Sequence, residues 1–454
     1  MLIRFVVNNV LSFGEQREFN MIPNTRLKTL MHHKYTKGDI ELLKMSSIYG
    51  ANGAGKSNLI KSIDFLRMIV TKEEISVQLK NSYFKFHEKK QHPKLLFAIE
   101  FIQDYIPFYY AIEIQNGTII TEELYQSGLG KVDDKLIFER KTDTNEKTDL
   151  NFFTEFEIDE KSQILKQVLI EDFIKPHIPV LKLISNRDND YLQNAKLAFK
   201  WFSETLRIIT PESKPNALAQ RIDVDSNFKK YAEDIMCTFN VGITSITSEK
   251  KDVKEFFGKD NENELDEIIK NVEESNSKMI GLRSRRGDEI IIVKENDTIN
   301  VKQLKLEHKG KNGQLINFNL DEESDGTIRL LDFIPAFKDL ISKNKVFLID
   351  EIERSIHPLL IKELIKKFSE DKKSEGQLIF TTHESNLLDQ DLFRQDEIWF
   401  AEKDRNGITD LYSLSDFKEH KTIDIRKGYL NGRYGSIPFL ANLKDLNWHE
   451  YDIN

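Results

Sequence analysis

Apolar and polar positions in the first seventy residues predict a strand, a turn, a second strand, a glycine-rich loop and a helix. The apolar run Met45–Tyr49 is typical of a buried strand. After the loop, the segment Lys56–Val70 places its apolar residues on one helical face, namely Leu59, Ile60, Ile63, Leu66 and Ile69. The chain therefore opens with the strand, loop and helix of an α/β domain.

The pattern changes between residues 95 and 126, where short β-branched and aromatic runs alternate with turn residues. This change predicts an antiparallel meander beside a parallel sheet. Residues 160–240 have mostly helical spacing, broken by prolines at 176, 179, 211 and 215. Residues 241–275 are charged, and we predict helix or loop there.

Strand-like runs between residues 288 and 309 precede Gly326, a predicted helix at about 327–342, and further strand and helix signals to about residue 402. We predict three parts, in which residues 1–155 and 281–454 form the two halves of one domain and residues 156–280 form a mainly helical inserted lobe. Heptad spacing never lasts beyond a couple of repeats, so we expect no long coiled coil.

Composition narrows the class of protein. The 454 residues carry 66 basic and 75 acidic side chains, a formal charge of -9, so any contact with nucleic acid requires a local basic patch. The single cysteine, Cys237, excludes an internal disulfide, and we expect it to be buried in the helical stretch Tyr231–Phe239. The amino terminus lacks a signal-peptide pattern, and no apolar run reaches eighteen residues. We expect a cytoplasmic protein without a membrane segment.

The segment Gly50–Ser57 fits the spacing G-x-x-x-x-G-K-[ST] between a predicted strand and a predicted helix. In such a loop, backbone N–H groups at the helix start face phosphate oxygens, and the lysine adds a positive charge. This pattern predicts binding of ATP, with Lys56 on the phosphates and the Ser57 hydroxyl on Mg²⁺. The residues expected to contact the nucleotide here are Gly50, Asn52, Gly53, Ala54, Gly55, Lys56, Ser57 and Asn58.

A second apolar strand, Val346–Ile349, ends in two adjacent carboxylates, Asp350 and Glu351. Ligands of parallel sheets bind at the carboxyl ends of the strands, so we expect Asp350 to hold Mg²⁺ and Glu351 to activate the attacking water. A plain strand followed by an acidic turn would look similar. A third strand, Gln377–Thr381, precedes His383, which either senses the γ-phosphate or has a structural role.

Several short segments resemble motifs of ABC-type ATPases. Glu353–Pro358 is similar to the D-loop that follows the catalytic glutamate, and His383 is similar to the switch histidine. Ser324 and Gly326, at the start of a predicted helix, resemble the signature turn that contacts the γ-phosphate bound to a partner subunit. Asp325 departs from the usual glycine, and an ordinary N-cap is the alternative explanation. Gln103 is a candidate Q-loop residue, although a surface glutamine at a strand end explains it better.

The order of these motifs, with the opening Asn9–Phe13 and the tail segment 428–438, resembles the ABC-type ATPases of bacterial phage-defence operons. Similar proteins include the ATPase of abortive-infection L systems and, more distantly, the PARIS ATPase and overcoming-lysogenization-defect nucleases. The resemblance implies an ABC-type P-loop ATPase head with an antiparallel β subdomain. It also implies a head-to-tail dimer or a multiple of it, with a separately encoded effector from a neighbouring gene, such as a Toprim-type nuclease. Only 71 residues follow His383, so we expect no intrinsic nuclease domain.

Two other functions stay open. A RecF-like DNA-repair or DNA-end-binding ATPase would use basic residues near the predicted strands at 288–306, although a solvated charged face explains them better. These residues are Arg283, Arg285, Arg286, Lys302, Lys305, Lys309 and Lys311. A small-molecule kinase would need neither Ser324 nor His383.

Overall fold

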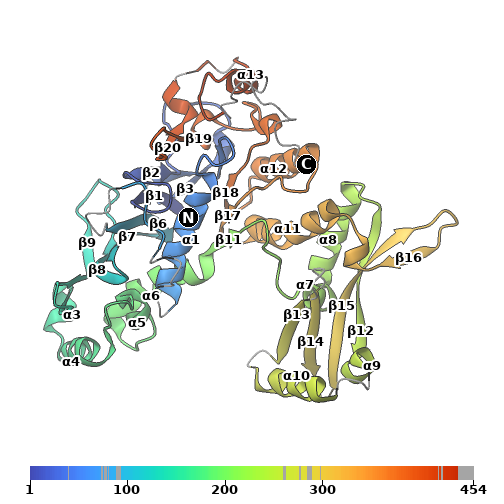
Figure 1. The fold of residues 1–454 in the computed structure, drawn as a ribbon, viewed down its shortest axis with the longest axis horizontal. Coiled ribbons are helices and arrows are strands. Elements are labelled where there is room, and N and C mark those ends of the chain that lie inside the picture. The colour runs from blue at the N-terminus through green and yellow to red at the C-terminus, as the bar shows by residue number, and fades with distance from the viewer. Residues whose placement is uncertain are drawn as a thin grey trace, which may run out of the picture. The chain divides into compact units, whose positions relative to one another are not determined.

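The computed structural model separates into two units, each with its own core (Figure 1). Unit 1 comprises Met1–Thr210, Lys343–Ile352 and Ser369–Asn454, and unit 2 comprises Pro211–Ser342 and Glu353–Phe368. The structure describes residues 1–38, 40–72, 75, 79, 81–87, 94–258, 262–275, 278–283, 289–296, 298–417, 419–420 and 423–437.

The central sheet of unit 1 has six strands in the order β11-β17-β18-β5-β19-β20. They are β5 (Met45–Tyr49), β11 (Leu206–Ile209), β17 (Val346–Ile349), β18 (Gln377–Thr381), β19 (Ile398–Lys403) and β20 (Thr409–Ser413). The first five are parallel, and β20 pairs antiparallel with β19. Since β18 lies between β17 and β5, the carboxyl ends of these three strands meet at one edge of the sheet. The three strands expected from the sequence are confirmed.

The second sheet of unit 1 is antiparallel, in the order β10-β9-β8-β7-β6-β1-β2. Its strands are β1 (Leu2–Asn8), β2 (Arg17–Asn20), β6 (Leu95–Gln103), β7 (Ile106–Gln115), β8 (Thr118–Gln126), β9 (Lys135–Thr142) and β10 (Thr148–Phe152). A separate hairpin joins β3 (Lys34–Lys37) and β4 (Ile40–Leu43). The meander expected at residues 95–126 is confirmed, and it continues through two more strands.

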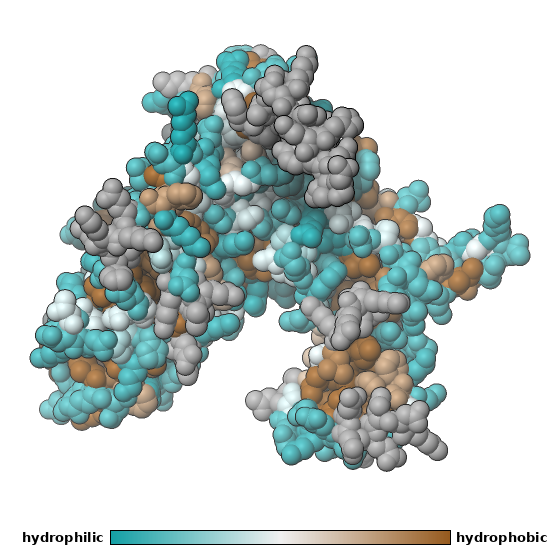
Figure 2. Space-filling view, in the orientation of Figure 1, coloured by the Kyte–Doolittle hydropathy of each residue, from teal (hydrophilic) through white to brown (hydrophobic). Residues whose placement is uncertain are grey.

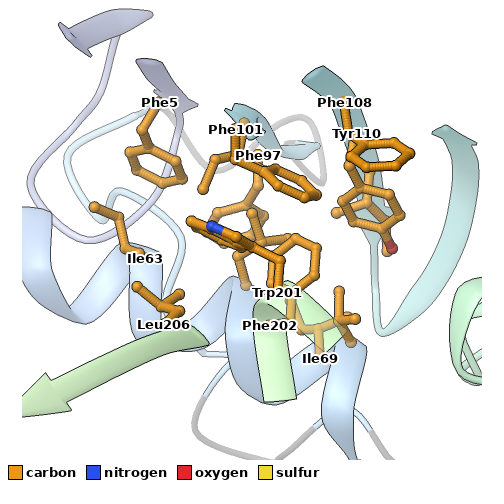
Figure 3. Close-up of a cluster of buried hydrophobic side chains, with 14 of the residues drawn as sticks. Phe5, Ile63, Ile69, Phe97, Phe101, Phe108, Tyr110, Trp201, Phe202 and Leu206 are labelled. Atoms are coloured by element: carbon orange, nitrogen blue, oxygen red, sulfur yellow. The ribbon is translucent and has the colours of Figure 1, made fainter. Parts of the chain in front are cut away.

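Aromatic residues join the antiparallel sheet to the helix that follows the glycine loop, α1 (Lys56–Thr71) (Figure 3). The ring of Trp201, from the π-helical turn η4 (Trp201–Thr205), stacks on Phe101 of β6 with centroids 4.3 Å apart. Phe202 meets Phe101 edge-on at 5.4 Å, a geometry that aromatic rings favour. Ile63 and Ile69 of α1 belong to the same buried cluster. This cluster fixes α1 against the sheet.

Short helices follow β10: α3 (Thr154–Ile158), α4 (Glu160–Val168), the π-helical turn η2 (Leu169–Phe173), α5 (Val180–Ser185) and α6 (Gln193–Lys200). Buried Glu122 of β8 accepts hydrogen bonds from the N–H groups of Val180 and Leu181, at 2.7 and 2.9 Å, and so anchors the start of α5. Over α3 and α4 the surface carries hydrophobic residues among hydrophilic ones (Figure 2). The exposed apolar side chains of this segment are Ile158, Ile164, Val168, Ile170 and Phe173.

One strand of the central sheet, β11, lies inside the region that we expected to be mostly helical. It pairs in parallel with β17, and its last carbonyl, of Ile209, accepts a hydrogen bond of 2.8 Å from the N–H of Asp350. Four residues are too few for periodicity to distinguish a buried strand from a buried helical turn. Pairing with β17 selects the strand, because the edge of β17 has backbone N–H and C=O groups that need hydrogen-bond partners.

Unit 2 contains an antiparallel sheet in the order β12-β15-β14-β13, with β16 also paired to β15. The strands are β12 (Ile243–Asp252), β13 (Met279–Arg283), β14 (Glu289–Glu295), β15 (Thr298–Lys309) and β16 (Leu315–Phe318). The helices include α7 (Leu218–Val224), α8 (Ser226–Thr238), α9 (Val253–Phe257), α10 (Glu262–Glu274) and α11 (Asp325–Ser342), while α12 (Pro358–Glu370) contributes to both units.

Two expectations for unit 2 are wrong. Residues 243–252, expected as helix or loop, form β12, because their cross-strand pairing with β15 outweighs a charged sequence with little alternation. Cys237 is exposed rather than buried. It lies near the end of α8, where the adjacent Met236 occupies the core-facing position and Cys237 turns outward.

The structure contains no long helix within its described part, where the longest is α11 with 18 residues. The expected mixed α/β fold with antiparallel sheets is thereby confirmed. Over the same residues, none of the helices is both long and apolar enough to cross a membrane.

Candidate functional site

The loop Gly50–Ser57 connects β5 to α1 at the edge where the strands end. Gly55 has φ 109°, a backbone conformation that side-chain-bearing residues rarely adopt. A Cβ atom at this position would lie 2.1 Å from Oγ1 of Thr409. Only glycine therefore lets the loop pass this close to β20.

Lys56 is the first residue of α1, and only 5% of its surface is exposed. Its ammonium group donates hydrogen bonds to the carbonyls of Gly50, at 2.7 Å, and Ala51, at 3.1 Å. The charge is therefore held over the loop, at the helix end where backbone N–H groups lack helical partners. A positive charge at the start of a helix fits a phosphate group.

Ser57 and Asp350 meet directly. The Ser57 hydroxyl donates a hydrogen bond of 3.0 Å to Oδ1 of Asp350, and the Thr381 hydroxyl donates one of 2.5 Å to the same oxygen. Asp350 is 5% exposed. One carboxylate and one hydroxyl beside a phosphate loop suit Mg²⁺, which prefers oxygen ligands and retains water and phosphate oxygens. The donor set therefore fits the expected cation.

Glu351 follows Asp350 in a left-handed conformation, with φ 50°. Its N–H donates a hydrogen bond of 2.8 Å to the Thr381 hydroxyl, and its residue surface is half-buried. Adjacent residues of an extended strand point to opposite faces, but this turn changes the direction of Glu351 relative to Asp350. The two adjacent carboxylates are thus not related as neighbouring side chains of a regular strand.

Other residues predicted around the loop differ in their surroundings. Asn52 and Gly53 are exposed, whereas Ala54 is buried. The Asn58 side chain donates a hydrogen bond of 2.7 Å to the Ser12 hydroxyl. Ser12 also accepts a hydrogen bond of 2.7 Å from Thr409. Asn58 therefore takes part in a network that supports the loop.

His383 is exposed, two residues after β18 ends. Gln103 is buried at the end of β6, where its side-chain oxygen accepts a hydrogen bond of 2.9 Å from the Thr205 hydroxyl. The explanation of Gln103 as a surface glutamine is therefore wrong. The sequence shows only that the residue ends a strand; the partner that buries it lies 102 residues away.

Ser324 and Gly326 lie in unit 2, whereas the other predicted site residues lie in unit 1. The Ser324 hydroxyl accepts a hydrogen bond of 3.1 Å from the N–H of Thr327, which is the geometry of a helix N-cap. A Cβ atom on Gly326 would lie 2.6 Å from the carbonyl oxygen of Ser355. The signature-like turn thus packs against the D-loop-like segment inside unit 2, and the small size of Gly326 permits this contact.

Of the basic side chains considered for DNA that the structure describes, two form ion pairs with carboxylates. Lys302 is fully buried and pairs with Asp223 and Glu295, so its inclusion as a phosphate contact is wrong. Lys305 pairs with Glu249 at 3.4 Å. Among the described side chains of this group, Lys309 is exposed, and so is Lys311. The Arg283 side chain, Arg285 and Arg286 fall outside the described residues.

Sequence reasoning missed two residues that shape the site. Thr381 binds Asp350 and Glu351, and Thr409 supports the phosphate loop. Thr381 was visible only as the last residue of a predicted strand. Ser12, which accepts a hydrogen bond from Thr409, belongs to the opening motif Asn9–Phe13. The resemblance therefore pointed to this motif without indicating what Ser12 does.

The family model described as "AAA domain, putative AbiEii toxin, Type IV TA system" matches residues 45–389. That range contains the phosphate loop, the acidic pair and the strand before His383. No curated protein matches the chain.

Among solved structures, the chain is similar to an SMC head domain from Thermotoga maritima, with 12% identity and a TM-score of 0.38 over 91% of this chain and 98% of that one. It is also similar to an SmcHead bound to the C-winged helix domain of ScpA, with 13% identity and a TM-score of 0.42 over 92% and 99%. A third similar structure is an Smc head domain with an extended coiled coil bound to the C-terminal domain of ScpA, from Pyrococcus furiosus. It has 15% identity and a TM-score of 0.40 over 95% and 99%.

Proposed function

The chain belongs to the AAA-domain family described as putative AbiEii toxins of type IV TA systems, a family of P-loop nucleotide-binding proteins, and from this premise we propose that it hydrolyses ATP. The observation that carries the proposal is the convergence of Lys56, Ser57 and Asp350. The lysine charge is held over the loop, and the Ser57 hydroxyl contacts the Asp350 carboxylate at 3.0 Å. This arrangement supports binding of a triphosphate with its Mg²⁺.

For hydrolysis, we assign Glu351 to orient and deprotonate water and His383 to contact the γ-phosphate. A carboxylate beside the metal position, yet separately oriented, is suited to act on water without binding the cation. Bound Mg²⁺ would supply charge stabilisation at the phosphates. Ser57 and Asp350 would hold it, and Lys56 would orient the phosphates.

We further propose that two copies pair head to tail, so that Ser324 and Gly326 of one copy complete the site of the other. A helix N-terminus with a serine hydroxyl suits a phosphate group. Ser324 and Asp325 at the start of α11 are exposed and Gly326 is half-buried, so this turn is accessible to another copy. The capping bond of Ser324 is an alternative use of the same hydroxyl, and the experiment below separates the two.

Complementation between inactive variants tests the shared site. Lys56→Ala and Ser324→Arg should each abolish hydrolysis when alone, because every site in a homodimer then lacks one component. In an equal mixture, half of the dimers are mixed and each contains one intact site, so about a quarter of wild-type activity should return. The measurement is phosphate release after mixing and subunit exchange. Activity that stays at zero after proven exchange rejects the shared site, while Ser324→Arg alone near wild-type activity rejects any role of Ser324.

The biological role that we propose is control of a separately encoded effector protein. The product of a neighbouring gene is the first candidate for this effector. The family description, which refers to toxins and type IV TA systems, supports a two-component arrangement. Nucleotide-dependent closure of the dimer would then change which effector state it binds. Co-expression and co-purification of wild type and Lys56→Ala test this. The proposal is rejected if the neighbouring gene's product associates with neither wild type nor Lys56→Ala and if phage resistance survives Lys56→Ala.

A further inference from the structure

Thr381, the last residue of β18, contacts three successive residues after β17 and is fully buried. Its hydroxyl donates a hydrogen bond of 2.5 Å to Oδ1 of Asp350 and accepts one of 2.8 Å from the N–H of Glu351. Its carbonyl accepts a hydrogen bond of 3.2 Å from the N–H of Ile352. One residue thus fastens the whole turn that carries the two acidic groups.

The direction of these bonds matters. A hydroxyl has one hydrogen, and because the Glu351 N–H can only donate, the Thr381 hydrogen is free to point at Asp350. Threonine therefore orients the carboxylate and at the same time satisfies the backbone of the next residue. The bond to Glu351 also holds a non-glycine residue at φ 50°, a conformation that costs about 1 to 2 kcal/mol.

The strand that ends in Thr381 also leads to His383. The residue that bonds the Asp350 carboxylate and the Glu351 backbone is therefore two positions from the proposed γ-phosphate contact. A displacement of His383 along the chain would reach the acidic turn through the intervening Thr382 and the hydrogen bonds of Thr381.

We propose that Thr381 is a positioning residue for hydrolysis, which sets the metal affinity of Asp350 and the placement of Glu351 without contacting the nucleotide itself. The inference rests on the proposed function of this site. It predicts that loss of the hydroxyl impairs metal binding and turnover and leaves metal-free nucleotide affinity unchanged.

The test compares Thr381→Val with Thr381→Ser and with the matched control Thr382→Val. Valine has nearly the shape of threonine but lacks the hydroxyl, whereas serine keeps it. Thr382 is equally buried, and its hydroxyl accepts a hydrogen bond from Glu384 N–H, away from the acidic turn. Thr382→Val therefore controls for the loss of stability caused by replacing a buried threonine with valine.

Two readouts are needed: kcat and KM for ATP, and binding of Mn²⁺, followed by electron paramagnetic resonance with a non-hydrolysable ATP analogue present. Thr381→Val should lower kcat about tenfold and weaken Mn²⁺ binding about tenfold, the effect of losing one hydrogen bond to a charged group. Affinity for the analogue without metal should change less than about twofold. Thr381→Ser should restore both readouts to within about threefold of wild type.

Equal Mn²⁺ affinity in wild type and Thr381→Val overturns the inference, and so do equal losses in Thr381→Val and Thr382→Val. A wild type that binds Mn²⁺ but hydrolyses no ATP rejects the proposed ATPase function instead. In that case the Mn²⁺ comparison still decides the role of Thr381.

Discussion

The Ser57 hydroxyl donates a hydrogen bond of 3.0 Å to the Asp350 carboxylate, although 293 residues separate them in the chain. The contact forms because Ser57 follows β5 and Asp350 follows β17, and only β18 lies between these parallel strands. The same edge holds the phosphate loop. Two side chains that belong to separate sequence motifs therefore meet at the position that we propose for a cation.

Removal of the loop lysine should weaken nucleotide binding strongly and leave the fold intact. Lys56→Ala removes a charge held over the loop, and we expect affinity for a fluorescent ATP analogue to fall about 100-fold, or about 2.7 kcal/mol. Lys61→Ala is the matched control, because Lys61 is exposed on the same helix. Similar affinity in the two variants would contradict the assignment of Lys56.

Glu351→Gln should uncouple binding from turnover. The amide keeps the size of the side chain but cannot accept the proton from water, so we expect kcat to fall by about 10² or more while ATP affinity is retained. Retained ATP should also enrich the dimer in size-exclusion chromatography. Glu363→Gln, at an exposed position of α12, serves as the control. Hydrolysis by Glu351→Gln at the wild-type rate would show that another group acts as the base.

The two inner glycines of the phosphate loop should respond differently to alanine. A methyl group on Gly53 meets nothing within 4 Å, so Gly53→Ala should cost only about 1 kcal/mol for its φ of 78°. Gly55→Ala forces a carbon to 2.1 Å from the Thr409 side chain and must displace the loop. We expect a lower melting temperature and at least tenfold weaker nucleotide binding for Gly55→Ala than for Gly53→Ala. Equal effects would mean that the loop tolerates displacement from β20.

A buried proton-sharing pair in unit 1 predicts a defined pH dependence. Nδ1 of His33 lies 3.0 Å from Oε2 of Glu397, and both side chains are fully buried. Burial lowers the pKa of His33 from 6.5 to about 3 and raises the pKa of Glu397 well above its ordinary 4.5. Just above pH 4.5 the folded pair therefore keeps a proton on Glu397, whereas the unfolded chain keeps one on His33. Where both states hold one proton, the pair adds almost no pH dependence to the free energy of unfolding.

Glu397→Gln should expose the cost of burying neutral His33. With the carboxyl gone, only the unfolded chain binds a proton as the pH falls below 6.5, so the folded state loses stability until the pH nears 3. Between pH 6.5 and 5.0 the variant should lose about 1.5 kcal/mol more than wild type. Urea unfolding followed by tryptophan fluorescence at both pH values measures this difference. If the free energy of unfolding changes equally with pH in wild type and Glu397→Gln, the folded His33–Glu397 pair does not hold the single proton assigned to it.

Local pattern was sufficient for the elements that carry the expected chemistry. The strands at 45–49 and 377–381 and the helix after the glycine loop follow from runs and spacings of a few residues, because their apolar content alone defines which face is buried. The strand at 206–209 was not predictable in this way, since four apolar residues suit either structure and only pairing with β17 selects one.

The sequence by itself determined which chemical groups are present in this protein: a lysine and a serine after a phosphate-loop spacing, and two acids after an apolar strand. Tertiary structure alone decided that Thr381 holds both acids, that Thr409 excludes a side chain at Gly55, and that Lys302 is buried between carboxylates. The reason is physical. Periodicity reports burial along one element, whereas each of these contacts joins elements far apart in the chain, and their meeting depends on the order of strands in a sheet.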